Sequence, residues 1–171
     1  PPPDPRAILP PGGRPPSTRK AVVISQWTSM LDLVQRPLEA AGIAYERLDG
    51  ASSQPQRSAT LAKFADDNAV QVLLLSLRAG GVGLNLVAAQ TVYLMDPWWN
   101  PAVEEQAINR VHRIGQCYPV RVVRYLMQHS VEDRILELQS KKSALVKGAL
   151  GAGAEEAKAM RVEDLKWLFS K

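Results

Sequence analysis

Apolar residues form five short runs along the chain, each of the kind found in buried strands. Residues 70–76 and 91–96 are apolar over almost their whole length, as strands are when both faces of their sheet are covered. Residues 21–25, 44–48 and 120–127 form three more runs of strand character. We therefore predict five strands in these positions.

The segments between the runs have helical periodicity and residues that favour helix ends. Met30, Val34 and Leu38 share one helix face ahead of Gly42, a residue type that commonly follows a helix. Ser53 and Gln56 form the capping-box pair that opens another helix. Strands that alternate with helices predict a parallel, doubly wound α/β sheet.

Two further helices have strong start signals. Asn100 can cap a helix whose first position is Pro101, with Glu104 near the positive end of the helix dipole. Ser130 can cap a long helix that carries acids early and lysines late, as the dipole favours.

Composition divides the chain into three parts. A chain of 171 residues, 46% hydrophobic and 22% charged, has the size and composition of one globular domain. Residues 1–19 are rich in proline and predict an extended linker, and residues 20–150 hold the predicted strands and helices. Residues 151–171 form a tail with a short helix, which we expect to dock through one apolar edge made by Leu165, Leu168 and Phe169.

The stretch EQAINRVHRIGQ, residues 105–116, places two arginines at helical spacing. On a helix Gln106, Arg110 and Arg113 would share one stripe, with His112 on the opposite side. A neighbouring apolar stripe would be formed by Val103, Ala107, Val111 and Ile114. The arginines would then stand beside the buried face, at a cleft wall, which suggests a ligand in a cleft.

Positive charge is concentrated in the same part of the chain. The net charge is +4, yet residues 106–124 contain four arginines and no acid. Such a patch suits phosphate, either from a nucleotide or from a nucleic acid backbone. A solvated basic face would explain the same pattern.

Cysteine and histidine are too scarce for some kinds of site. Cys117 is the only cysteine, so we expect no internal disulfide and a reducing compartment such as the cytosol or nucleus. Together with His112 and His129 it cannot supply ligands at metal spacing, so we predict no metal site. No apolar run approaches the roughly twenty residues of a membrane helix, and the start does not resemble a signal peptide, so we expect a soluble protein.

The glycine-rich segment SLRAGGVGLN follows the third predicted strand, where backbone amides commonly hold phosphate. A dinucleotide site would need a third glycine where Leu86 stands, and too few residues remain for a crossover helix. A nucleoside triphosphatase would need a GxxxxGK[ST] loop and an Asp-Glu pair for magnesium, and the sequence contains neither. We therefore expect that the chain cannot hydrolyse ATP alone.

Two arginines on a cleft wall, without a phosphate loop in the same chain, match the role of an arginine finger. Such a residue completes an ATPase site whose phosphate loop and magnesium belong to another domain. The same arginines could instead serve only to bridge a carboxylate.

Four segments, in order, resemble the motifs of one family: KAVVISQWTSMLDLV, YERLDGASS, LLLSLRAGGVGLNLVAAQTVYLMDPWWNP and EQAINRVHRIGQ. They are similar to the second RecA-like lobe of Swi/Snf-type ATP-dependent DNA translocases of helicase superfamily 2, over residues 20 to about 148. The DPWWNP segment and the RVEDLKWLF ending look most like the helicase-like transcription factor and postreplication-repair branch. The resemblance implies a three-layer RecA-like sandwich with a central, mainly parallel sheet.

The resemblance also implies a set of nucleotide contacts. Gln106, Arg110 and Arg113 match the family's last motif, with Arg113 as the finger and Arg110 as a phosphate contact or cleft support. Gly81, Gly83 and Asn85 match a segment that senses nucleotide and DNA, although a tight turn alone would also require glycine. ATP with Mg²⁺ is the implied cofactor, and the phosphate loop and metal ligands would come from the N-terminal lobe, which this chain lacks.

DNA contacts are implied at strand ends and helix starts, where sheet ligands bind. The matching positions are Ser25, Gln26, Trp27, Ser52, Ser53, Ser76, Arg78 and Gly80. Hydroxyls and helix-start amides suit phosphate but do not read bases, so binding should be salt-sensitive and independent of sequence. Arg78 stands where the family more often has lysine. Arg57 also matches a family arginine, although a surface ion pair would explain it equally well.

The resulting expectation is the second ATPase lobe of a nuclear double-stranded DNA translocase, inactive without its N-terminal lobe. Its role would be in chromatin remodelling or DNA-damage tolerance, and candidate partners besides DNA are nucleosomes and ubiquitin-pathway proteins. One alternative is a nucleic-acid-binding or protein-interaction module that has lost ATPase function. A second alternative is a dinucleotide-dependent enzyme, against which Leu86 and the short crossover argue.

Overall fold

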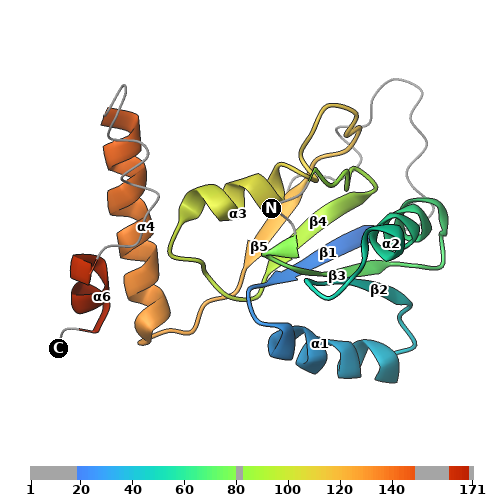
Figure 1. Cartoon of the computed structure of the whole chain (residues 1–171), viewed down its shortest axis with the longest axis horizontal. Helices are drawn as coiled ribbons and strands as arrows, with labels where there is room; N and C mark the ends of the chain where they lie inside the picture. The colour runs from blue at the N-terminus through green and yellow to red at the C-terminus, as the bar shows by residue number, and fades with distance from the viewer. Residues whose placement is uncertain (1–18, 80–82, 149–161, 170–171) are drawn as a thin grey trace, which may run out of the picture.

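A five-stranded parallel sheet forms the centre of the molecule (Figure 1). The computed structural model describes residues 19–79, 83–148 and 162–169, except the side chains of 143–148, 163 and 165. The strands are β1 (Lys20–Ser25), β2 (Tyr45–Leu48), β3 (Val72–Ser76), β4 (Ala89–Leu94) and β5 (Arg121–Arg124). They pair in the order β2-β3-β1-β4-β5, and every pair is parallel. The predicted parallel α/β sheet is confirmed.

Helices cover both faces of the sheet and give it three layers. The helices are α1 (Thr28–Ala40), α2 (Gln54–Asp66), α3 (Pro101–Ile108), α4 (Val131–Gly148) and α6 (Val162–Phe169). Side chains alternate along β1, so that Val22 and Ile24 belong to one core and Val23 to the other. Phe64 of α2 and Ala107 of α3 complete the first core, while Leu31 of α1 packs in the second. Within the described residues no helix has the length and apolarity that crossing a bilayer requires.

The capping residues predicted for three helix starts form hydrogen bonds there. The Asn100 side chain accepts a hydrogen bond from the Ala102 N–H at 3.1 Å, and the Ser130 hydroxyl accepts one from the Glu132 N–H at 3.1 Å. The Ser53 N–H donates to the Gln56 side chain at 2.8 Å, which is the Gln half of the predicted capping box. These local bonds satisfy donors that every helix start leaves without a partner.

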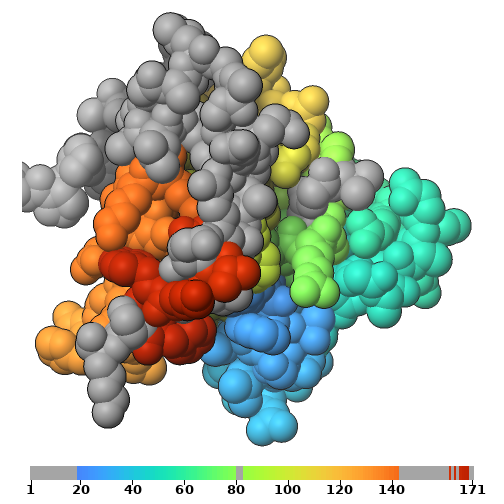
Figure 2. All heavy atoms as spheres, turned by 60° about the vertical axis from the view of Figure 1, so that its left-hand side comes forward, coloured from blue at the N-terminus to red at the C-terminus, as the bar shows by residue number. Residues whose placement is uncertain are grey.

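The C-terminal helix packs against α4, as expected for the tail. Lys142 of α4 forms an ion pair with Asp164 of α6 at 3.0 Å, and its side chain is only 7% exposed. The ammonium of Lys141 lies 3.9 Å from the centre of the Trp167 ring. In Figure 2 the red atoms of α6 lie on the orange surface of α4.

The expected apolar edge of the tail is only partly formed. Leu168 is buried, but Phe169 is 74% exposed, and the side chain of Leu165 lies outside the described atoms. The edge prediction is therefore wrong for Phe169. Besides the buried Leu168, an ion pair and a cation–π contact join α6 to α4.

We expect Asp164→Ala to loosen α6, because Lys142 would keep its charge in a nearly buried position without this partner. The cost should be about 1–3 kcal/mol. It should appear as faster amide hydrogen exchange across α6, while exchange in β1 and β3 stays unchanged. Lys166→Ala, at an exposed position of the same helix, is the control. Equal exchange in the two variants would show that the ion pair does not hold the helix.

Candidate functional site

The carboxyl ends of β1 and β4 meet in a polar cluster around Asp96. The Asp96 carboxylate accepts hydrogen bonds from the Ser25 hydroxyl and, at 2.9 Å, from the Gln26 N–H. The Ser25 hydroxyl oxygen in turn accepts the Trp27 N–H at 3.0 Å. Ser25 is buried, whereas the Trp27 side chain is 60% exposed beside it. This cluster holds Gln26 and Trp27 at the carboxyl edge of the sheet. The predicted contact between Ser25 and DNA stays a prediction.

Burial raises the pKa of Asp96 above its ordinary value of 3.8. The hydrogen bonds from Ser25 and Gln26 act in the opposite direction, and the nearby charge of Glu132 raises the pKa further. Sequence reasoning did not single out Asp96, although an acid directly after a buried strand, followed by proline, is a visible signal.

Two more predicted DNA segments lie along the same edge. Ser52 and Ser53 precede α2, where Ser53 is exposed and Ser52 half-buried. Ser76 is buried at the end of β3, where its hydroxyl accepts the Ala79 N–H at 3.2 Å. Arg78 is exposed next to it, and Gly80 lies outside the described residues.

The arginine motif differs from the predicted helix. Helix α3 ends at Ile108, and residues 109–116 form successive turns. A tertiary contact explains the early end, because the Gln116 side chain donates to the carbonyls of Val87 and Ala89 at 3.1 and 2.8 Å, which draws the chain towards the start of β4. Gly115 completes the turn with a φ of 102°, a value that favours glycine. The helical stripe therefore does not extend to the arginines.

Because the helix ends early, the burial of residues near the arginines differs from the burial predicted for a continuous helix. Ala107 and Val111 are buried as predicted, but Ile114, expected on the same apolar stripe, is fully exposed. Arg113 is exposed in the turn rather than set in a cleft wall of this lobe, and Gln106 is exposed on α3. His112 is also exposed, beside Arg113.

Arg110 is the partly buried member of the arginine motif. Its carbonyl accepts the Leu86 N–H at 3.0 Å, which ties the turn to the glycine-rich segment. Its Nε is buried and has no hydrogen-bond partner among the described residues. An inward-facing guanidinium nitrogen without an acceptor costs free energy unless a ligand supplies one.

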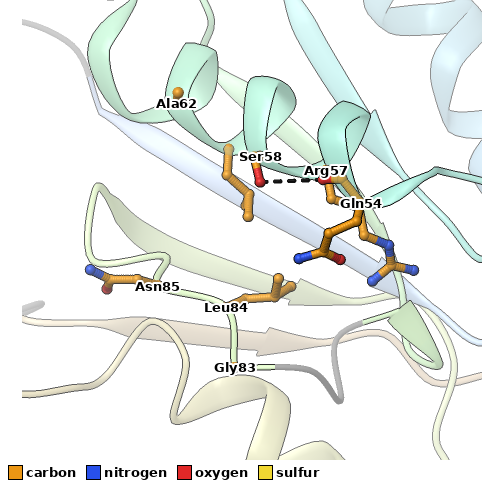
Figure 3. Close-up of a pocket in the computed structure, with 8 residues that line it drawn as sticks. Gln54, Arg57, Ser58, Ala62, Gly83, Leu84 and Asn85 are labelled. Carbon is orange, nitrogen blue, oxygen red and sulfur yellow. Dashed lines mark hydrogen bonds between the residues drawn. The ribbon is translucent and has the colours of Figure 1, made fainter.

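The described end of the glycine-rich segment lines a hollow beside α2. Figure 3 shows Leu84 pointing towards Gln54 and Arg57 of this helix, with Gly83 and Asn85 on either side of Leu84 along the loop. The cavity has a volume of about 420 Å³. Gly83 has a φ of 37°, and Gly81 lies outside the described residues. Because Leu86 bonds to Arg110, this segment joins the hollow to the arginine turn.

The two predicted sets of contacts thus occupy opposite edges of the sheet. The Leu77 N–H bonds to Ser25 and the Met95 N–H to Ile24, which places the DNA set at the carboxyl ends. Gln116 bonds to the start of β4, which places the arginine turn at the amino ends.

Glu104 is a buried carboxylate whose importance the sequence did not reveal. It is only 1% exposed and accepts hydrogen bonds from the Trp98 N–H at 2.6 Å and from the Gln139 side chain at 2.8 Å. Arg124 of β5 forms an ion pair with its other oxygen at 2.7 Å. Helices α3 and α4, strand β5 and the loop before α3 therefore meet at one residue, whereas the sequence indicated only a favourable charge at the start of α3.

The tandem tryptophans are both half-buried. Trp98 packs against the core, whereas Trp99 meets the Lys142 ammonium 4.7 Å from its ring centre. One tryptophan thus packs inside the lobe, and the other contacts α4.

The residues at the amino edge fit a nucleotide phosphate. The orphaned Nε of Arg110 and the exposed guanidinium of Arg113 are donors that a phosphate oxygen can satisfy. Among the described residues no three His, Cys, Asp or Glu side chains are arranged to hold a metal ion.

Comparison with known proteins identifies the lobe. Residues 12–115 match the helicase conserved C-terminal domain. The chain belongs to this helicase family. The C-terminal part of the Fun30 ATPase domain has the same fold with a TM-score of 0.69 and 33% identity, over 71% of this chain and 39% of that one. The three-layer sheet is therefore a RecA-like helicase lobe.

Relatives of this helicase lobe are Swi/Snf-type helicases of the Rad5 and helicase-like transcription factor kind. The DNA repair protein RAD5A of Arabidopsis thaliana is 47% identical over 90% of the chain, and the helicase-like transcription factor CHR27 of the same plant is 48% identical over 88%. The DNA repair protein rad8 of Schizosaccharomyces pombe is 46% identical over 88%. The chain spans only 15%, 14% and 13% of the lengths of these three proteins.

Removal of the buried carboxylate should destabilise the helicase lobe strongly. Glu104→Ala leaves the Trp98 N–H, the Gln139 amide and Arg124 without their shared acceptor, so we expect a loss of about 3 kcal/mol or more in the free energy of unfolding. Glu105→Ala, at the next and exposed position, should change it by less than about 0.5 kcal/mol. Urea denaturation measures both, and similar losses in the two variants would contradict the importance of the network.

Asp96 should make stability depend on acid pH. Its pKa is higher in the folded than in the unfolded state, so folding favours its protonated form. Its contribution is therefore complete below about pH 3.8 and falls as the pH rises through the folded-state pKa. The unfolding free energy of the natural protein, relative to that of Asp96→Asn, should fall as the pH rises from 3.8 towards neutrality. A constant difference across urea titrations in this window would show that Asp96 is not perturbed.

Proposed function

We propose that this chain is the second ATPase lobe of a double-stranded DNA translocase that acts in DNA repair or chromatin remodelling. The observation that carries the proposal is the arginine turn at the amino edge, where Arg110 has a buried nitrogen without an acceptor and Arg113 projects from the surface. The chain has no phosphate loop of its own, so these donors would act on a nucleotide held by another lobe.

ATP with Mg²⁺, bound by the N-terminal lobe, would supply the phosphoanhydride bond. Arg113 would donate to the oxygens of the transferred phosphoryl group as negative charge develops on them, and the Nε of Arg110 would gain its missing acceptor from the same phosphate. Gln106 lies exposed on α3, one turn before Arg110, and would add its side-chain amide to the site. Gly83 and Asn85 lie in the segment that leads from the DNA surface to this site, and Gly81, proposed as a further nucleotide contact, lies outside the described residues.

The carboxyl edge is the proposed DNA surface. Gln26, Trp27, Ser53 and Arg78 present amide, aromatic, hydroxyl and cationic groups there. Such groups suit a phosphate backbone and carry no base code, so the lobe binds any duplex sequence. Three serines of the proposed DNA set lie deeper at this edge: Ser25 and Ser76 are buried, and Ser52 is half-buried. Gly80, the last proposed contact, follows Arg78 in the sequence and lies outside the described residues.

The proposed cellular setting follows from the relatives. Those named as DNA repair proteins include RAD5A and rad8, and another is named ATP-dependent helicase rhp16. We infer a nuclear protein whose N-terminal lobe is the required partner, with nucleosomes and ubiquitin-pathway proteins as further candidates. The isolated lobe is inactive because it lacks the phosphate loop.

The decisive test is DNA-stimulated ATP hydrolysis by the two-lobed protein. We expect Arg113→Ala to lower turnover by about a thousandfold or more, because a finger acts on transition-state charge, while DNA affinity is retained. His112→Ala, at the exposed neighbouring position, is the matched control and should retain turnover.

An unchanged rate in Arg113→Ala would remove the finger assignment. Absence of DNA-stimulated turnover in the natural two-lobed protein would favour the alternative of a binding module without ATPase function.

A further inference from the structure

Arg57 points towards backbone carbonyls rather than towards a carboxylate. It lies in the first turns of α2, and its Nε donates to the Ser52 carbonyl at 3.2 Å. One terminal nitrogen donates to the Asp49 carbonyl at 3.2 Å, and the other approaches the Ala79 carbonyl at 3.5 Å. The guanidinium therefore joins the loop before α2 to the loop after β3.

The two loops joined by Arg57 are each ordered internally. In the first loop the Asp49 carboxylate accepts the Ala51 N–H at 3.1 Å and the Arg47 Nε at 3.1 Å. In the second, the Ala79 N–H donates to the Ser76 hydroxyl at 3.2 Å, and the Leu77 N–H donates to the Ser25 carbonyl at the end of β1 at 2.8 Å. Arg57 thus links one ordered loop to another, and through Leu77 to the end of β1.

All of these segments carry predicted DNA contacts. The first loop leads to Ser52 and Ser53, the second holds Ser76 and Arg78, and the end of β1 holds Gln26. Groups that grip one duplex backbone must keep a fixed spacing, because misplacement by about an ångström weakens several contacts together. A planar fork that holds three carbonyls is suited to fix that spacing.

We propose that Arg57 is a positioning residue for duplex binding, which sets the distance between the loop 49–53 and the loop 77–79 without itself contacting DNA. The proposal rests on the proposed function of the carboxyl edge as a DNA surface. It replaces the two sequence-based interpretations of Arg57, a direct contact and a surface ion pair, with a link between backbones. It also explains a part-buried cation at the end of the hollow (Figure 3).

Charge and geometry can be separated by a conservative substitution. Arg57→Lys keeps the positive charge, but a single ammonium cannot reproduce three divergent hydrogen bonds. If Arg57 contacted a phosphate directly, lysine would substitute well as a point charge. Arg57→Gln removes the charge as well. Lys63→Ala, at an exposed cation on the same helix, is the control for lost charge on α2.

The experiment measures affinity of the two-lobed protein for a blunt DNA duplex over a range of salt concentrations. We expect Arg57→Lys and Arg57→Gln each to weaken binding about tenfold or more, and Lys63→Ala to bind like the natural protein. Amide hydrogen exchange of the same variants should be faster at Ser52, Leu77 and Ala79, while the β1 and β3 amides keep their protection and show that the lobe is folded.

Three results would overturn the positioning role. The first is that Arg57→Lys binds DNA with natural affinity, while only Arg57→Gln binds more weakly, with a salt slope smaller by about one phosphate contact. This result would show that Arg57 contacts DNA directly. Natural affinity in both variants would show that the link is not needed. Weakened binding without faster exchange of the loops would show that Arg57 acts by another route.

A different set of results would show that the carboxyl edge is not a DNA surface at all. In that case the natural protein would not show salt-sensitive duplex binding, and Arg78→Gln would not weaken it. Weaker binding by Arg78→Gln together with natural binding by Arg57→Lys would keep the DNA surface and reject only the positioning role.

Discussion

Everything at the two edges of this lobe depends on the parallel pairing of β1 with both of its neighbours. Ser25 lies in register with Ser76 on one side, and Ile24 with Leu94 on the other. A parallel ladder brings all carboxyl ends to one edge, so residues from positions 25, 76 and 96 converge there although the chain separates them widely. The same register sends the arginine turn to the opposite edge through Gln116 and β4.

The sequence predicts most of the scaffold because the responsible forces are local or periodic. The run at 70–76 is apolar because both faces of β3 are covered, and the caps at Asn100 and Ser130 use side chains next to the helices they open. The end of α3 could not be read in this way. It depends on bonds between Gln116 and carbonyls at positions 87 and 89, which no local pattern reveals.

For the candidate site, the sequence named residues but did not give their geometry, and the binding role of those residues stays a prediction. The motif residues were recognisable, yet the exposure of Ile114 and the inward Nε of Arg110 follow from the turn that replaces the helix. Glu104 was visible only as a charge near a helix start, because its partners Arg124 and Gln139 come from elements that follow later in the chain. Sites tend to break local rules in this manner, since strain and unsatisfied groups are retained where a ligand relieves them.

The docking of α6 changes where the folding unit ends. Lys142 of α4 lies between Asp164 of α6 and the Trp99 ring. A domain boundary after residue 150 would separate Lys142 from the helix that carries its counter-ion. Loss of α6 would leave the Lys142 ammonium against the Trp99 ring without Asp164. Trp99 directly follows Trp98, whose N–H donates to the buried Glu104. A lobe cut after residue 150 would therefore keep the surface of α4 but lose the carboxylate of Asp164 that pairs with Lys142.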